Sequence, residues 1–301
     1  MRQEKKVYMV NPVHPGDGKV PFGGLAEGTF PNRGAEVVQP KPYFHGMFRI
    51  TRYVLSDILQ NRIVVGYAIF LFAISVGLFN LSGDQAKGMI SLLNIVLIVI
   101  PLVSIIFSTI HFYNSYEFIE LLAAQPIKRN SILQSQFNGL AIALSIAIFV
   151  GIGLPVAWYS PNLTGLSLLL VSLFLTWVFV SIAIFASVST RDKAKGIGLA
   201  LLLWFYFSLL YDAIVLMLMF SFNEYPLEKA MIAMVALNPI DLSRVIMLLQ
   251  MDVSALMGYT GALFREFLGT GYGIALAAFI QLLWIVLPLA AARRTFRKKD
   301  L

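Results

Sequence analysis

One carboxylate lies inside an otherwise uncharged apolar stretch of the chain. Asp212 is the only charged side chain in residues 196–222. A carboxylate in an apolar segment of this length is unfavourable unless it is paired or hydrated, so it is a candidate for a role in transport or gating. The alternative is a structural hydrogen bond to a neighbouring helix, with Tyr206, Tyr211 or a Ser as the partner.

Methionine is the second residue type with a possible chemistry. Seven of the eleven Met residues lie in one part of the sequence, namely Met217, Met219, Met231, Met234, Met247, Met251 and Met257. Thioethers are soft ligands that suit Cu(I). Met also fills apolar cores, and no tight Met array with His accompanies these residues. Packing is therefore the favoured reading, with copper binding as its alternative.

The sequence contains no residues or motifs typical of an enzyme active site. The chain contains no Cys, and His14, His45 and His111 lie far apart in the sequence. His111 reads as a polar residue at the end of an apolar segment. No phosphate-binding Gly-rich loop, nucleophile elbow or zinc-protease motif occurs. We therefore expect neither an enzyme nor a metal or cofactor site in this chain.

Long uncharged stretches must position these residues. Hydrophobic residues make up 58% of the chain and charged ones only 13%, about half the share in soluble domains. About 20 apolar residues cross a bilayer as a helix. The sequence therefore predicts an all-α, multi-pass membrane protein with six transmembrane helices. These are residues 63–81, 89–112, 137–158, 165–188, 196–222 and 271–292, the third and fourth separated by a turn at Ser160, Pro161, Asn162 and Gly165.

The distribution of basic residues sets the orientation. If both termini lie inside, 19 of the 23 Lys and Arg residues are on the inner side. Positively charged loops stay in the cytoplasm, so we expect both termini inside the bacterial inner (cytoplasmic) membrane. This arrangement explains the net charge of +7 better than nucleic-acid binding does.

Three segments flank these helices. Residues 1–47 are rich in Pro and Gly and predict a flexible cytoplasmic extension. Residues 48–62 predict an amphipathic helix at the inner interface, with Phe48, Leu55, Ile58 and Leu59 on one face. Residues 223–270 predict an outer loop of short helices at the outer membrane surface, with Asp241 as a possible cap of the helix through Arg244.

The segment between the second and third spans resembles the cytoplasmic loop of ABC-2-type permeases. That family has an acidic residue, a Leu-Leu pair, a Pro, a basic residue and an Ile in this order. The resemblance covers residues 48–301 and implies docking on a separate ATPase, which would carry ATP and Mg. The positions implied as the coupling loop are Glu117, Glu120, Leu121, Leu122, Pro126, Lys128 and Arg129. Charged side chains would give a soluble partner a specific surface and the Leu pair an apolar anchor; an ordinary solvated loop is the alternative.

A narrower resemblance comes from the fifth span and the outer loop. Residues 198–212 and 237–244 are similar to the permease of the transporter that serves nitrous oxide reductase maturation. This resemblance implies a homodimer, an ATPase dimer and a periplasmic β-helical protein. It also implies an outer contact through Asn238, Pro239, Asp241 and Arg244.

Three functions are compatible with these observations. The first is a permease that couples ATP hydrolysis to transport or mechanical transmission during copper-sulfur centre assembly. The second is a general ABC-2 exporter of a lipid, drug or ion. The third is a membrane scaffold that does not transport. Stimulation of a partner ATPase would separate the first two from the scaffold.

Overall fold

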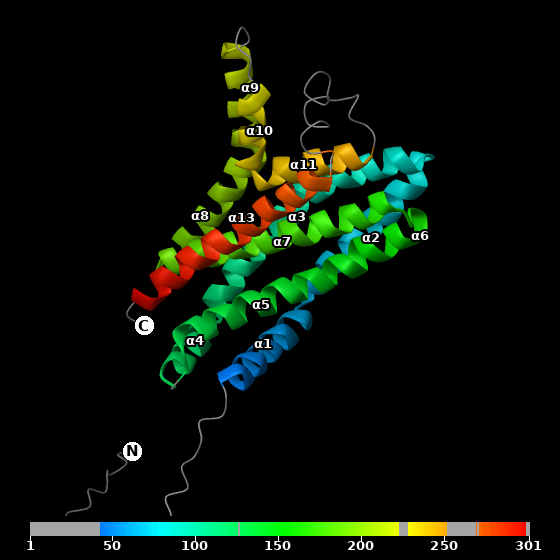
Figure 1. The fold of residues 1–301 in the computed structure, drawn as a ribbon. Helices are drawn as coiled ribbons and strands as arrows, with labels where there is room; N and C mark the ends of the chain where they lie inside the picture. Colours follow the sequence, from blue (N-terminus) through cyan, green and yellow to red (C-terminus); the bar gives the residue numbers. More distant parts are fainter. Residues whose placement is uncertain (1–42, 126, 223–227, 252–268, 270, 299–301) are drawn as a thin grey trace, which may run out of the picture. The chain divides into compact units, whose positions relative to one another are not determined.

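The computed structural model describes residues 43–125, 127–222, 228–251, 269 and 271–298 (Figure 1). Among these residues the chain forms helices and short connections, with no strand, which confirms the predicted all-α class. Residues 1–42, most of the predicted N-terminal extension, lie outside the described residues, as do Pro126 and Met257.

Six described segments are long and apolar enough to cross a membrane, as predicted. They are α2 (Arg62–Ser82), α3 (Gln85–Asn114), α5–η1–α6 (Arg129–Ile148, Phe149–Gly153 and Leu154–Tyr159), α7 (Leu163–Ser189), α8–η2–α9 (Lys193–Phe205, Tyr206–Leu210 and Tyr211–Ser221) and α13 (Gly271–Lys298). Each is longer than the predicted span. The backbone hydrogen bonds of a helix continue through the polar border of the membrane until a cap or turn ends them.

Asn and Asp side chains set where several of these helices begin. Asn61, Asp84, Asn162 and Asp192 each accept a hydrogen bond from a backbone N–H in the first turn of α2, α3, α7 and α8. Such caps satisfy donors that have no partner within the helix. Gly83 ends α2 with a φ of 61°, a left-handed conformation that favours glycine. The turn predicted after Tyr159 is present between α6 and α7.

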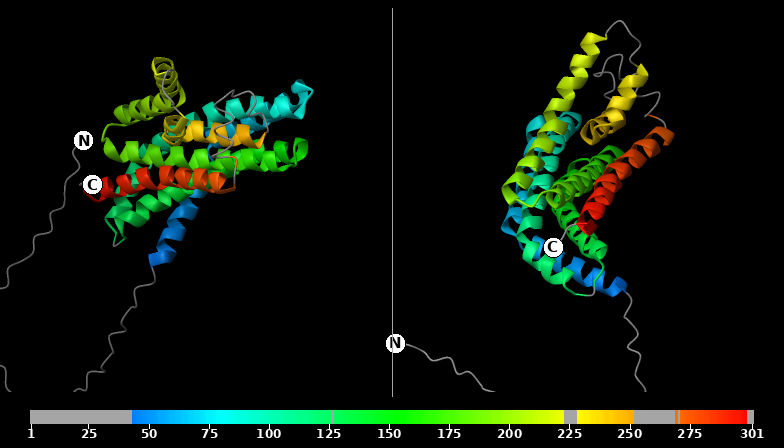
Figure 2. Two further views of the ribbon diagram at one scale, coloured as in Figure 1. Left: turned by 45° about the horizontal axis from the view of Figure 1, so that its top comes forward. Right: turned by 90° about the vertical axis from the view of Figure 1, so that its left-hand side faces the viewer.

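The core lies along α3 and α7. In α7, 67% of the most apolar stretch is buried, whereas in α8–η2–α9 the share is 11%. Figure 2 shows α7 between its neighbours and α8 and α9 at the margin of the helices. Ser181 of α7 donates a hydrogen bond to the Ile285 carbonyl of α13 over 2.7 Å. The fifth span is therefore the one that other described helices cover least.

Four shorter helices complete the described residues. They are α1 (Tyr43–Leu59), α4 (Tyr116–Ala123), α10 (Glu228–Ala236) and α11 (Pro239–Gln250). The expected outer loop thus contains short helices, but α11 is not merely a surface element. Ile240, Leu242 and Met247 are buried, because α11 packs against α7, α3 and α13.

The amphipathic helix predicted before the first span is present as α1, with a different buried face. Ile50, Val54 and Ile58 are buried, whereas Phe48 is 70% exposed. The stripe that contacts α5 consists of the β-branched residues Ile50, Val54 and Ile58, and Phe48 of the predicted apolar face lies outside this contact. Gly139 of α5 permits this approach, since a Cβ there would come within 2.5 Å of the Val54 side chain.

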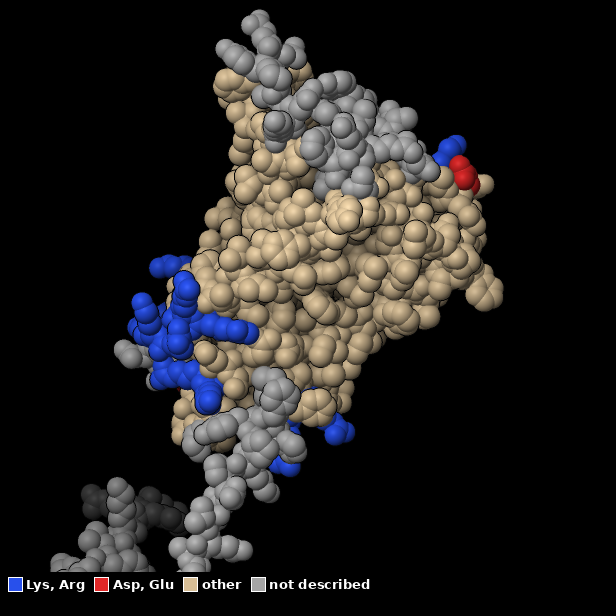
Figure 3. All heavy atoms as spheres, in the orientation of Figure 1, with Lys and Arg blue, Asp and Glu red and all other residues tan. Residues whose placement is uncertain are grey.

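Basic residues gather at one end of the molecule, which we call the basic end. It is the end at which α3, α7 and α13 finish and α5 and α8 begin (Figure 3). Its described cations are Lys128, Arg129, Arg191, Lys193, Lys195, Arg293, Arg294, Arg297 and Lys298. At the opposite end, Gln85 donates to the Tyr159 carbonyl over 2.6 Å.

Candidate functional site

At the basic end, α4 forms a short amphipathic helix between α3 and α5. Ile119 and Leu122 are buried, and Glu117, Glu120 and Leu121 are exposed, with Leu121 67% exposed. Residues three and four apart lie on one helix face, so these three side chains form a continuous exposed strip. The predicted Leu pair is thus divided: Leu122 holds α4 in place, and Leu121 is available to a partner.

The rest of the predicted coupling loop leads into α5. Lys128 is exposed and precedes the first residue of α5, while Arg129 is half-buried. Pro126 lies outside the described residues. Phe118 of α4 contacts Tyr53 of α1, with ring centroids 5.2 Å apart. Two helices far apart in the sequence therefore share the surface that includes α4.

A second connection at the basic end is bound to the end of α3. The hydroxyl groups of Tyr113 and Thr190 lie 2.5 Å apart, and Lys193 donates to the Asn114 side chain over 2.8 Å. Gly196 permits this contact, because a Cβ there would lie 2.0 Å from the Tyr113 hydroxyl oxygen. The end of α3, which leads into the predicted coupling loop, is thus joined to the connection between α7 and α8. The contact between Tyr113 and Thr190 was not predicted from the sequence. Gly196, in the first turn of α8, was the residue that could have indicated a close approach there.

Toward the opposite end, the two polar sites predicted separately form one cluster. Arg244 of α11 donates to the carboxylates of Asp212 and Asp241, both over 3.0 Å. Asn238 donates to Asp241 over 3.0 Å. We call Asp212, Asn238, Asp241 and Arg244 the polar clasp. It places the outer element in contact with the carboxylate of the fifth span, and Arg244, rather than a Tyr or Ser, is the partner of Asp212.

The start of α11 explains the geometry of the clasp. Asn238 caps the helix by accepting from the Ile240 N–H over 3.0 Å, so the predicted capping role of Asp241 was wrong. Pro239 occupies the first turn, where its missing N–H is tolerated. Asp241 follows in the same turn, directed to Asn238 and Arg244. Asn238 precedes the helix and therefore reaches a backbone donor of the first turn, whereas Asp241 lies within that turn and is left for the ion pair.

Hydrogen bonds extend the clasp to two spans. Asn238 donates to the Phe207 carbonyl in η2 over 2.9 Å, and Tyr211 donates to the Met234 carbonyl of α10 over 2.6 Å. A π-helical turn leaves a carbonyl without its usual helical donor, and Asn238 supplies one. From α13, Gln281 donates to the Pro239 carbonyl over 2.9 Å and to Ser243 over 2.7 Å.

The polar residues on α13 were missed by sequence reasoning. Besides Gln281, Trp284 donates to the Ala236 carbonyl over 3.2 Å. The available signal was a Gln within an uncharged span, a residue type that seeks partners in an apolar setting. The clasp and these bonds join α8–η2–α9, α10–α11 and α13.

The electrostatics of the clasp are unbalanced, with two carboxylates and one guanidinium. Asp241 lies on α11, which together with α10 forms a bent helix pair that is apolar enough to count as a seventh, broken span. Asp241 is largely buried and Asp212 lies close by, so desolvation and like charge both oppose two negative charges in the clasp, and Arg244 offsets them.

The described residues contain no metal site built from His, Cys, Asp or Glu. Groups of three or more His, Cys, Asp or Glu arranged to hold a metal are absent among them. Met247 is fully buried in the core, and Met251 packs against it, in keeping with the packing interpretation. His111 is buried, with its Nε2 3.3 Å from the Ser115 hydroxyl oxygen.

Comparison with known proteins places this architecture in a family. The model of the family described as "ABC-2 family transporter protein" matches residues 45–301. The chain belongs to the ABC-2 family of transporter proteins. This confirms the resemblance drawn from residues 116–132, and the match covers all the helices described, apart from the first two residues of α1.

A curated relative is consistent with that membership. The "Probable ABC transporter permease protein NosY" of Stutzerimonas stutzeri is 26% identical over 277 residues, which cover 84% of this chain and 98% of the relative. As an ABC-2 family protein, the chain is a multi-pass membrane subunit that is not itself the catalyst, and its family implies an ATPase partner. The bacterial relative implies the inner membrane.

Proposed function

We propose that this protein is the permease subunit of an ABC transporter and that its ATPase docks at the basic end. The exposed strip of Glu117, Glu120 and Leu121 on α4 is the observation that carries the proposal. It combines two charges that select a partner with one apolar side chain that can be buried on binding. Lys128 and Arg129 would complete the surface, and ATP and Mg would bind the partner.

Motion of the ATPase would reach the spans through two connections. α4 is held by Ile119 and Leu122, so displacement of its exposed strip moves the ends of α3 and α5. The contacts of Tyr113 with Thr190 and of Lys193 with Asn114 carry the same displacement to α7 and α8. Packed helices respond to such a push by shifting or tilting as rigid bodies.

We further propose that two copies of the chain act together, in support of copper-sulfur centre assembly in nitrous oxide reductase. Support comes from the relative named as a NosY permease and from the resemblance of residues 237–244. In this proposal the outer side lies next to a periplasmic β-helical partner. Asn238, Pro239 and Asp241 are buried in the chain, so they would hold α11 in position rather than touch that partner, and Arg244 is the half-buried residue of the four. A general ABC-2 exporter remains the alternative that the family match supports equally.

Affinity purification of the protein from gently solubilised native membranes, followed by mass spectrometry, tests both the ATPase partner and the role in copper-sulfur centre assembly. An ATPase together with a secreted β-helical protein supports the maturation role. An ATPase alone favours a general exporter, and neither partner favours a scaffold.

A matched pair of variants tests the docking strip. Leu121→Ala should reduce ATPase co-purification, whereas Leu163→Ala, which alters a 70% exposed Leu at the start of α7, should not. Equal recovery of the ATPase with both variants would contradict docking through α4.

A further inference from the structure

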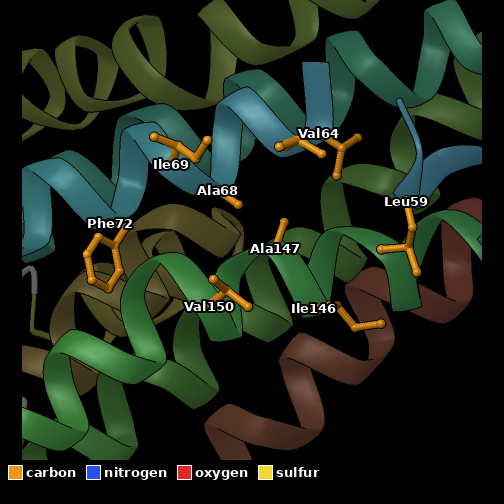
Figure 4. A pocket seen from close by; sticks show the side chains of 9 residues that line it. Leu59, Val64, Ala68, Ile69, Phe72, Ile146, Ala147 and Val150 are labelled. Atoms are coloured by element: carbon orange, nitrogen blue, oxygen red, sulfur yellow. The ribbon is translucent and has the colours of Figure 1, made fainter. Parts of the chain in front are cut away.

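The region where α1 ends and α2 begins contains a pocket whose lining side chains are all hydrocarbon. Its volume is about 420 Å³, within the usual range for ligand pockets. Leu59 lines it from α1, and α2 and α5–η1 form its two sides (Figure 4). The lining residues are Leu59, Val64, Val65, Ala68, Ile69, Phe72, Ile146, Ala147 and Val150. No hydrogen-bonding side chain is available to a polar ligand within it.

The pocket faces outward from the helices. Its walls include Val65, Ile69 and Val150, which are 46%, 63% and 41% exposed. Further along, α2 and η1 come into close contact, since a Cβ on Gly151 would lie 2.6 Å from the Leu71 Cβ. Because α2 and α5 span the membrane, the exposed walls meet lipid rather than water.

A basic side chain lies on the same face of α2 as two residues of the pocket wall. Arg62 precedes Val65 by three residues and Ile69 by seven, so the three share one face of α2. Arg62 is exposed and makes no ion pair with the residues described. It stands at the start of α2, on the side of the bundle nearer the basic end. On α1, Arg52 shares a face with Leu59 by the same spacing and is also exposed.

We propose that this pocket binds one acyl chain of an anionic phospholipid whose phosphate contacts Arg62. A hydrocarbon pocket on the same face of α2 as a cation that has no ion pair among the described residues matches both parts of such a lipid. Guanidinium groups bind phosphate through several parallel hydrogen bonds, and Arg52 adds positive charge nearby. The bound chain would fill the space between α1, α2 and α5, and so support the packing of α1 at the start of the first span.

The experiment uses the full-length protein purified in detergent. The protein is incubated with an equal mixture of phosphatidylglycerol and phosphatidylethanolamine, and retained lipid is measured by native mass spectrometry. Wild-type protein should retain phosphatidylglycerol preferentially. Arg62→Gln should lower that preference by about fivefold, since one basic side chain at an anionic surface contributes about that factor. Arg294→Gln, an exposed cation of α13 at the same end, is the matched control and should leave the preference unchanged.

A second pair of variants tests the pocket itself. Ala68→Phe fills the cavity and should abolish retention, whereas Ala73→Phe, at an exposed position of α2 outside the pocket, should not. A phosphatidylglycerol with a photoreactive group in its acyl chain provides a test on the unaltered protein. It should label residues 64–72 and 146–150.

Three results would overturn the proposal, and the first two concern the pocket. One is labelling elsewhere together with equal retention by Ala68→Phe and Ala73→Phe. The other is efficient disulfide formation between two copies that carry Ile69→Cys, because the pocket would then be a contact between copies. Binding of free inorganic phosphate that protects Arg62 without any lipid preference would also contradict it.

Discussion

At the residue scale, the polar clasp is where the most consequential side chains meet. Arg244 and Asp212 are about one third exposed, whereas the Asp241 side chain is 12% exposed. Partial exposure weakens an ion pair through solvent screening, so the bond to Asp241 contributes more than the bond to Asp212. The clasp therefore depends chiefly on Arg244, which serves both carboxylates.

Arg244→Gln should destabilise the protein more than Asp212→Asn does. Loss of Arg244 leaves Asp241 largely buried without a cation, at a cost of about 1–2 kcal/mol, whereas Asp212→Asn keeps the pair of Arg244 with Asp241. Thermal unfolding in detergent, monitored by circular dichroism, measures the difference. An equal loss in both variants would show that Asp212 and Asp241 contribute alike.

At the scale of elements, close helix contacts are made possible by individual small residues. α1 approaches α5 at Gly139, next to the branched side chain of Val54, and η1 approaches α2 at Gly151. Val54 has few rotamers and its Cβ would itself lie 2.9 Å from a Cβ added at Gly139. A methyl group added at residue 139 can therefore be accommodated only if the backbone moves, because Val54 is not a flexible side chain.

Gly139→Ala should displace α1 and destabilise the protein by about 1–3 kcal/mol, in the range of overpacked cores. Gly66→Ala in α2 is the control, because nothing lies within 4 Å of a Cβ there, and the better helix propensity of Ala should make it neutral or stabilising. Thermal unfolding measures the change in stability of both variants, and limited proteolysis at α1 measures the displacement of that helix. Unchanged stability of Gly139→Ala would mean that α1 does not rest on α5 through Val54.

At the scale of the whole molecule, charge separates the two ends. The described cations at the start of α5, at the start of α8 and at the end of α13 gather at the basic end, whereas Lys87 lies at the start of α3 toward the opposite end. The positive-inside rule therefore predicts that the basic end is cytoplasmic. This orientation places α4 on the side where an ATPase would bind.

Absence of Cys from the sequence makes that orientation directly testable. In intact spheroplasts, a membrane-impermeant maleimide should label Lys87→Cys and should label Arg297→Cys only after permeabilisation. The wild-type chain is the unlabelled control. The reverse pattern would overturn the orientation and, with it, docking of an ATPase on α4.

The sequence by itself determined the all-α class and the six spanning helices. Long apolar stretches without charge form helices in lipid because backbone groups must be paired within the segment, and this local requirement is readable from composition. Capping residues such as Asn162 and turn residues such as Gly165 are likewise local. The family could also be predicted from the sequence, because the order of Glu, Leu-Leu, Pro and a basic residue in residues 116–132 is a linear pattern.

Only the tertiary structure decided which of these residues meet. Asp212 and Arg244 are far apart in the sequence, and their pairing depends on how α11 packs between α7 and α13. The same packing brought Gln281 and Trp284 to α10 and α11, and it divided Leu121 from Leu122 by placing one side of α4 on the bundle. Contacts between segments depend on the shape that both present, which no single segment encodes.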